Sequence, residues 1–212
     1  MEDKLWHKSY APNFPKSLDY EKVTISEALT RSAKNFPNHT ALNYMGKKIT
    51  YVELDRLVNS FARALQDLGI REGDKVGVCL PNIPQVIISN LAIFRIGAVT
   101  VQNNPLYTER ELAYQLNDSD AKMVITLTPL ITKMKNIKPK TKIEKIIGCY
   151  VNTYLPFPKK QLFPFVKKDM YCKIVPTNDI KVFKDLIGHY SAAPVEDCSK
   201  WDELGALLYT GG

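Results

Sequence analysis

The sequence contains few of the residues that build disulfide frameworks, metal sites and histidine-based active sites. Only three histidines are present, and each is isolated in the sequence. The cysteines include no C-x-x-C pair, and none lies at metal-ligand spacing from a histidine. We therefore expect reduced thiols, no metal site and no catalytic histidine. All four cysteines are predicted to be packing residues: Cys79, Cys149, Cys172 and Cys198.

No apolar run is long enough to cross a bilayer, which requires about 20 consecutive apolar residues. The most apolar region, residues 86–101, is interrupted by Ser89, Asn90 and Arg95. This region is therefore predicted to be a buried core segment. The amino-terminal residues show neither the apolar core nor the small-residue cleavage site of a signal peptide. We expect a cytoplasmic protein.

Acidic residues are scarce in one part of the chain. Residues 131–173 hold eleven lysines against only Glu144 and Asp169, a local charge of +9. Because the whole chain carries +7, the remainder sums to −2. The basic character belongs to this segment and not to the molecule as a whole. Nucleic acid is not expected as a partner, because the segment has no arginine and no recognisable reading element.

A helix-start signature, Thr-x-x-Glu, occurs three times. In this capping box the threonine hydroxyl and the glutamate carboxylate each bond the other residue's backbone N–H. Apolar residues at helical spacing follow the second box, and Gly69 then supplies the positive φ that suits a helix end. The three boxes pair Thr24 with Glu27, Thr50 with Glu53, and Thr108 with Glu111.

Strand and helix signals alternate along the middle of the chain. Strands are predicted at residues 75–80, 98–102, 121–126 and 145–151, and helices begin near Pro84, Thr108 and Thr128. Each connection is long enough to hold a helix, which is typical of a parallel sheet. Residues 40–51 predict a hairpin that turns at Gly46. The predicted fold class is α/β, a mainly parallel sheet flanked by helices.

We expect three parts in the chain. Residues 1–151 form the α/β subdomain with the parallel sheet. Residues 152–177 form an irregular excursion rich in lysine and aromatic residues, because prolines there prevent a long helix. Residues 178–212 form a helix capped by Asn178 and carrying Ile180 and Phe183, then a linker and a strand at residues 206–209.

Residues 154–168 interleave aromatic and aliphatic side chains with Lys159, Lys160, Lys167 and Lys168. Such a mixture suits an anionic membrane surface, where each nearby lysine contributes about 1 kcal/mol. The alternative is that the aromatic side chains pack onto the domain and the lysines are solvated. We favour packing, because prolines interrupt the continuous amphipathic helix that membrane docking usually uses. Peripheral membrane contact through residues 154–168 remains the second interpretation.

The chain closes with a short apolar strand followed by Tyr209, Thr210, Gly211 and Gly212. A pair of glycines after a strand is by itself more often a simple turn than a phosphate loop. The context favours the loop, because ligands of parallel sheets bind beyond the carboxyl ends of strands, where backbone N–H groups converge on anions. We interpret these four residues as the start of a phosphate-binding loop.

Three stretches together resemble a known family: "TYVELDRLVNSFARALQDLGIREGDKVGVCLPNIPQVIISNLAIFRIGAVTV", "NNPLYTERELAYQLNDSDAKMVIT" and the closing "LLYTGG". As a set they are similar to the amino-terminal part of the AMP-forming adenylating enzymes, in particular the long-chain fatty acyl-CoA synthetases. The resemblance covers residues 26–212. In that family the phosphate loop reads Tyr-Thr-Ser/Gly-Gly-Thr-Thr-Gly and is followed by Pro-Lys-Gly. This sequence stops after the fourth residue of that loop.

The resemblance implies a ligase that joins a fatty acid to coenzyme A through an acyl-adenylate, using ATP and Mg²⁺ and releasing AMP and diphosphate. Tyr209, Thr210, Gly211 and Gly212 would begin the ATP phosphate loop. The family places its phosphate-binding lysine, its magnesium-holding acid and its catalytic lysine further along the chain. We therefore expect no catalytic residue and no metal ligand within these 212 residues. The isolated chain is expected to be a truncated, inactive amino-terminal fragment.

Two alternatives remain open at this stage. The chain could be a non-catalytic binding or interaction module that uses the same fold, or part of a ligase for aryl or medium-chain acids. The strand at residues 206–209 also predicts self-association, because an apolar strand edge without its later partners exposes backbone donors and acceptors.

Overall fold

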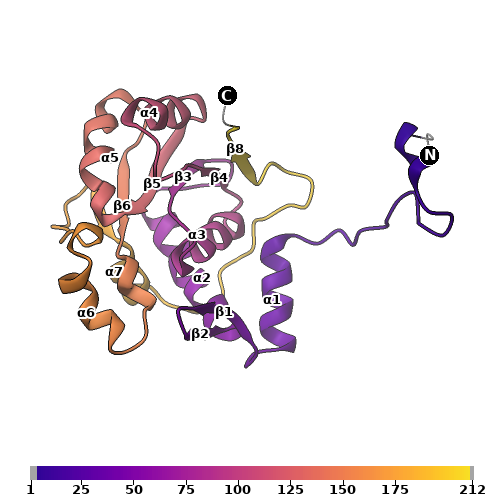
Figure 1. The fold of residues 1–212 in the computed structure, drawn as a ribbon, viewed down its shortest axis with the longest axis horizontal. Helices are drawn as coiled ribbons and strands as arrows, with labels where there is room; N and C mark the ends of the chain where they lie inside the picture. The colour runs from indigo at the N-terminus through magenta and orange to yellow at the C-terminus, as the bar shows by residue number, and fades with distance from the viewer. Residues whose placement is uncertain (1–3, 211–212) are drawn as a thin grey trace.

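A six-stranded parallel sheet forms the centre of the computed structural model, which describes residues 4–210 (Figure 1). Its strand order is β7-β6-β5-β3-β4-β8, and every neighbouring pair is parallel. The prediction of an α/β fold with a mainly parallel sheet is confirmed. The strands are β3 (Lys75–Cys79), β4 (Val99–Gln102), β5 (Ala121–Leu127), β6 (Lys145–Cys149), β7 (Ile180–Val182) and β8 (Ala206–Leu208).

Helices cover both faces of this sheet (Figure 1). One core contains α2 (Tyr51–Asp67), α3 (Pro84–Arg95) and α7 (Phe183–His189), and the other contains α4 (Glu109–Asp118) and α5 (Ile131–Ile137). Strand β5 supplies both cores, because Met123 and Ile125 face the first while Val124 faces the second. This alternation follows from the two-residue period of a strand. A sheet buried on both faces needs the nearly continuous apolar strands seen here.

The remaining elements are shorter or lie outside the main sheet. The predicted hairpin is confirmed as β1 (Thr40–Tyr44) and β2 (Lys47–Thr50), which turn at Gly46 with φ +99°. Helix α1 (Ile25–Asn35) packs against α2 and α3, and α6 (Lys159–Val166) lies between β6 and β7 in the sequence. The short 3₁₀ helices are η1 (Leu5–Ser9), η2 (Thr128–Leu130), η3 (Lys138–Lys140), η4 (Val151–Tyr154) and η5 (Lys168–Met170).

Two of the three predicted capping boxes form in full. Thr50 with Glu53 and Thr108 with Glu111 make both reciprocal bonds. At α1, Thr24 accepts a hydrogen bond from the Glu27 N–H, but the box is incomplete. The Glu27 carboxylate instead accepts a hydrogen bond from Arg31, at 2.7 Å. The prediction was wrong for this glutamate because an ion pair one turn along the helix competes with the cap.

A buried arginine joins helices α1, α2 and α3. The side chain of Arg95 is 2% exposed and ion-pairs with Asp55 at 2.9 Å. Its guanidinium also donates to Asn59 at 2.7 Å, to Ser26 at 3.1 Å and to Thr30 at 3.2 Å. A buried charge is tolerated only when it is paired and hydrogen-bonded, and this one meets both conditions.

The segment from residue 190 to β8 runs back across the helices, from the β7 edge of the sheet to the opposite edge, where β8 lies (Figure 1). Asn59 Oδ1 accepts the N–H of Val195, and the Arg95 carbonyl accepts the N–H of Cys198. Arg63 donates to the Pro194 carbonyl at 2.8 Å. These contacts guide the connector to the open side of β4, where β8 pairs.

The structure corrects the prediction for residues 178–189. Asn178 does not cap a helix, because Ile180 and Val182 belong to β7 and pair with β6. Helix α7 begins only at Phe183. The alternating burial of this short strand leaves Ile180 and Val182 buried, and this pairing outweighs the helical periodicity. Strands β7 and β8 belong to the same six-stranded sheet as the strands before residue 151. The division into residues 1–151, 152–177 and 178–212 is not tested by this arrangement and stays a prediction.

The cysteine prediction is correct for two residues and wrong for another. Cys79 and Cys149 are buried, whereas Cys172 is exposed and Cys198 is partly exposed. All four are free thiols. Cys172 cannot be a packing residue, because it lies in an exposed stretch between η5 and β7. Among the residues that the structure describes, no helix has the length and apolar character needed to span a bilayer.

The predicted packing of residues 154–168 holds only in part. Leu155 is buried, and Phe163 is partly buried against the core. Four large apolar side chains are instead exposed, so the packing prediction was wrong for them. They are Phe157, Leu162, Phe165 and Val166.

Candidate functional site

The carboxyl ends of the parallel strands meet at one edge of the sheet, where ligands of such folds bind. The residues that leave β4 and β8 lie side by side there, because Gln102 at the end of β4 pairs with Leu208 at the end of β8. Asn103 follows β4, and Tyr209 and Thr210 follow β8. The strand order therefore brings the beginning of the predicted phosphate loop to the edge where such a loop functions.

Tyr209 is fixed to helix α4. Its hydroxyl donates to Asp118 Oδ2 at 2.7 Å and lies 3.1 Å from the carbonyl oxygen of Gln115. Partial burial, followed by the hydrogen bond to the Asp118 carboxylate, raises the pKa of Tyr209 to about 12. The hydroxyl therefore stays protonated at neutral pH and acts as a donor.

A second polar contact ties the same helix to the end of β4. Asn103 Nδ2 donates to Gln115 Oε1 at 2.9 Å, and both residues are buried. The Asn103 backbone N–H continues the sheet by bonding the Val78 carbonyl at 3.0 Å. Gln115 thus contacts Asn103 through its side chain and Tyr209 through its backbone carbonyl. Helix α4 fixes the positions of both strand ends at once.

The predicted site residues divide into two groups. Tyr209 and Thr210 are described by the structure, with Tyr209 anchored and Thr210 exposed. Gly211 and Gly212 lie outside the described residues. Sequence reasoning did not find Gln115 or Asp118, since nothing in the spacing of a helix shows which distant hydroxyl its carboxyl end will meet.

The loop after β3 opens helix α3, as predicted. Ile83 bonds back to the Pro81 carbonyl at 2.8 Å, and α3 begins at Pro84. In the first turn of α3, Gln85 Nε2 donates to the Tyr150 carbonyl at 2.8 Å, which joins this turn to the end of β6. A cavity of about 220 Å³ lies between this loop and β1.

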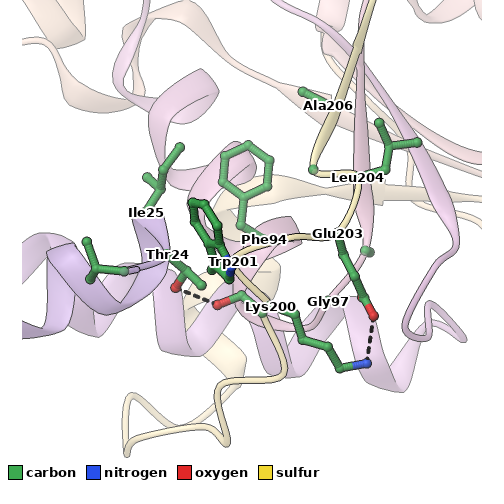
Figure 2. A pocket seen from close by; sticks show the side chains of 13 residues that line it. Thr24, Ile25, Phe94, Gly97, Lys200, Trp201, Glu203, Leu204 and Ala206 are labelled. Atoms are coloured by element: carbon green, nitrogen blue, oxygen red, sulfur yellow. Dashed lines mark hydrogen bonds and ion pairs between the residues drawn. The ribbon is translucent and has the colours of Figure 1, made fainter. Parts of the chain in front are cut away.

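Another cavity, of about 300 Å³, lies at the amino ends of β4 and β8 (Figure 2). Phe94 and Trp201 contribute its aromatic walls. Its polar groups already have partners, because Thr24 accepts from Ser199 at 2.7 Å and Lys200 pairs with Glu203 at 2.9 Å. This cavity lies at the end of the strands opposite to Tyr209, and we assign it no ligand.

Residues 4–210 contain no group of three or more histidine, cysteine, aspartate or glutamate side chains placed to hold a metal ion. Within this part of the chain there is thus no preformed cluster of ligands for the Mg²⁺ that the family resemblance implies. The backbone at Tyr209 and Thr210 fits the beginning of a phosphate-binding loop, because it follows a parallel strand at its carboxyl end.

Comparison with known proteins places this geometry in context. A family model described as "AMP-binding enzyme" matches residues 29–212. The long-chain-fatty-acid–CoA ligase of Bacillus subtilis is 34% identical over 215 aligned residues, covering 100% of this chain and 38% of the relative. 4-Coumarate–CoA ligase 4 of Arabidopsis thaliana is 41% identical over 93 residues, which cover 44% of this chain and 16% of that protein.

A solved structure supports the fold. The long-chain-fatty-acid-CoA ligase FadD1 from Archaeoglobus fulgidus superposes with a TM-score of 0.73 at 22% identity, covering 95% of this chain and 37% of that one. The chain thus spans under two fifths of the length of its full-length relatives. The family model covers most of the chain and the Bacillus relative aligns along all of it, so the chain belongs to the AMP-binding enzyme family.

Proposed function

We propose that this chain is the amino-terminal region of an AMP-forming long-chain fatty acid–CoA ligase. The observation that carries the proposal is the 34% identity to the Bacillus ligase along the whole chain, together with the family match to residue 212. The proposed reaction converts a fatty acid, ATP and coenzyme A to acyl-CoA, AMP and diphosphate. ATP supplies the adenylyl group that activates the carboxylate, and the thiol of coenzyme A accepts the acyl group.

The contribution of this part of the chain is positional. The hydrogen bond from Tyr209 to Asp118 and the contact of Asn103 with Gln115 hold the start of the loop against α4. Phosphoryl-transfer sites depend on such fixed positions, because donors must face the phosphate oxygens before charge develops on them. We propose that the backbone from Tyr209 to Gly212 begins the ATP phosphate loop, and that no group within these residues is catalytic.

The 212-residue chain alone is proposed to be inactive, because it spans only 38% of the Bacillus ligase. Loss of a single preorganised donor costs about 3 kcal/mol of transition-state stabilisation in other enzymes. A chain without most of its phosphate loop should therefore show no fatty-acid-dependent exchange of labelled diphosphate into ATP. Exchange catalysed by the isolated chain would contradict this proposal.

The decisive test of the activity uses the longer protein. The coding DNA beyond Gly212 is read for an in-frame Thr-Thr-Gly followed by Pro-Lys-Gly, and the encoded protein is assayed for acyl-CoA by mass spectrometry. We expect acyl-CoA from palmitate. An immediate stop codon would instead favour a non-catalytic module with the same fold.

An aryl substrate is the second candidate, because the 4-coumarate–CoA ligase relative is 41% identical over 93 residues. The same assay separates the two when palmitate, a medium-chain acid and 4-coumarate compete at equal concentrations. A product formed only from 4-coumarate would overturn the fatty acid assignment and leave the ligase assignment intact.

A further inference from the structure

Four large apolar side chains are exposed on and beside helix α6. Phe157 is 83% exposed, Phe165 74%, Val166 71% and Leu162 53%. Isolated exposed apolar residues are common, but a contiguous group of them marks an interaction surface. The four residues fall within ten consecutive positions, and three of them lie on one short helix.

The fold holds these side chains in an outward orientation. Leu162, Phe165 and Val166 follow the i, i+3, i+4 spacing that places residues on one face of a helix. Phe163 lies on another face and packs against the core. Asn152 Nδ2 donates to the Lys160 carbonyl at 2.9 Å, which ties α6 to η4. The apolar face is therefore preorganised and does not depend on folding at the moment of contact.

Lysines frame this face at both ends. Lys159 and Lys160 begin α6, and Lys167 and Lys168 follow its last residue. Residues 151–173 contain five lysines against the single acidic residue Asp169, a net charge of +4. Among the residues that the structure describes, these four lysines take part in no ion pair, so their ammonium groups are open to an external anion.

We propose that Phe157, Leu162, Phe165, Val166 and the four lysines form a docking surface, here called the α6 surface, for an anionic lipid bilayer. The apolar side chains enter the boundary between headgroups and acyl chains, and the lysine ammonium groups contact the lipid phosphates and carboxylates. A long amphipathic helix is not required, because the fold already presents the apolar face. This inference stands on the exposed residues and does not depend on the proposed ligase activity.

The position of α6 is compatible with a flat partner. Helices α6 and α7 lie at the outer end of the molecule, across the sheet from β8 (Figure 1). An apolar centre with a cationic frame matches an anionic bilayer better than it matches a second copy of this chain, because two such surfaces would bring like charges together.

The test is sedimentation of the 212-residue chain with vesicles of phosphatidylcholine, with and without phosphatidylserine. We expect binding that requires phosphatidylserine and weakens as salt is added. Changing all four lysines to glutamine should reduce the partition coefficient by at least about tenfold. The double variant Phe157→Ser, Phe165→Ser should reduce it by at least about tenfold as well.

Matched controls change residues of the same kind elsewhere. Lys47→Gln with Lys48→Gln removes exposed charge from the hairpin, and Phe14→Ser with Leu106→Ser removes exposed apolar side chains away from α6. Both controls should leave binding unchanged, and circular dichroism melting curves should match the unmodified chain. If a serine variant fails to fold, Phe165→Trp provides a second measurement. Its fluorescence should shift to the blue only with phosphatidylserine vesicles.

Three results would overturn the proposal. One is equal binding to vesicles with and without phosphatidylserine, or no binding to either. Another is a control variant that weakens binding as much as the α6 variants do. The third is an unmodified chain that dimerises in solution, does not bind vesicles and becomes monomeric on Phe157→Ser with Phe165→Ser, because a second copy would then cover the surface.

Discussion

The hydroxyl of Tyr209 lies 2.7 Å from the carboxylate of Asp118, although 91 positions separate the two residues in the sequence. The contact joins the residue that follows the last described strand to the carboxyl end of α4. A side-chain hydrogen bond to a charged group contributes about 1.5–3 kcal/mol when it is well protected, and less when it is partly exposed as here. This bond fixes the position of the backbone directly after β8.

Tyr209→Phe is therefore expected to lower the free energy of unfolding by about 1 kcal/mol, measured by urea denaturation. Tyr114→Phe, an exposed tyrosine on the same helix, is the matched control and should change it by much less. The pKa of Tyr209 is raised to about 12 in the folded chain, above its ordinary value of 10.0. The stabilisation of the fold by the Tyr209 hydroxyl is therefore complete below pH 10 and is lost as the pH rises through about 12. The difference in unfolding free energy between the unmodified chain and Tyr209→Phe should shrink over this pH range. A constant difference would contradict the assigned hydrogen bond from Tyr209 to Asp118.

Arg95→Ala is expected to destabilise the chain by about 3–5 kcal/mol, because it leaves the Asp55 carboxylate beside a cavity without its buried partner. The control is Arg31→Ala, which removes an exposed ion pair with Glu27 and should cost at most about 1 kcal/mol. Urea unfolding curves compare the two. Equal losses would show that the Arg95 cluster does not hold the three helices together.

Glu53 is expected to make α2 sensitive to acid. Its bond to the Thr50 backbone N–H lowers the pKa of the Glu53 carboxyl below its ordinary value of 4.5. A lowered folded-state pKa means that the stabilisation is present above pH 4.5 and is lost as the pH falls through the folded value. Glu53→Gln should flatten this acid limb of the unfolding free energy. The control is Glu27→Gln. No capping box forms at this glutamate, so its replacement should leave the α1 cap intact. Helical circular dichroism between about pH 3 and pH 6 measures the response of each variant to acid.

Self-association along β8 is the fourth expectation. Strand β8 pairs with β4 on one side, and Leu208 is 75% exposed. An apolar strand with an open edge templates pairing with another chain. Sedimentation velocity should show concentration-dependent association that Leu208→Lys suppresses. Leu204→Lys, at an exposed position before the strand, should not suppress it. A monomer at every concentration would refute the expectation.

The central strands and the starts of the helices beside them were largely predictable, because each depends on local signals. These signals lie within a single turn or a single strand. Examples are the capping box at Thr50, the proline that begins α3 and the apolar run of β5. The strand β7 was missed, since three residues pair with β6 only once the sheet exists. The exposure of Phe157 and Phe165 was also missed. Their composition is that of a core segment, and only the fold determines which side of α6 faces inward.

For the candidate site, the sequence predicted only the edge of the sheet at which it would lie. Ligands of parallel sheets bind beyond the carboxyl ends of the strands, so the strand predicted at residues 206–209 indicated at which edge Tyr209 would lie. Its anchors did not follow, because Gln115 and Asp118 reach Tyr209 through a contact between distant segments. Contacts between distant residues leave no periodic trace in a single sequence.

The connector that carries the chain across α2 and α3 to β4 has a consequence for the time course of folding. The pairing of Thr100 with Ala206 closes a loop of roughly half of these 212 residues, and such closures cost more conformational entropy than local turns do. The outer side of β4 stays open until residues 206–208 have been brought back to it. Folding should therefore finish at this border, and amide protons shared by β4 and β8 should be the last in the sheet to gain protection from exchange.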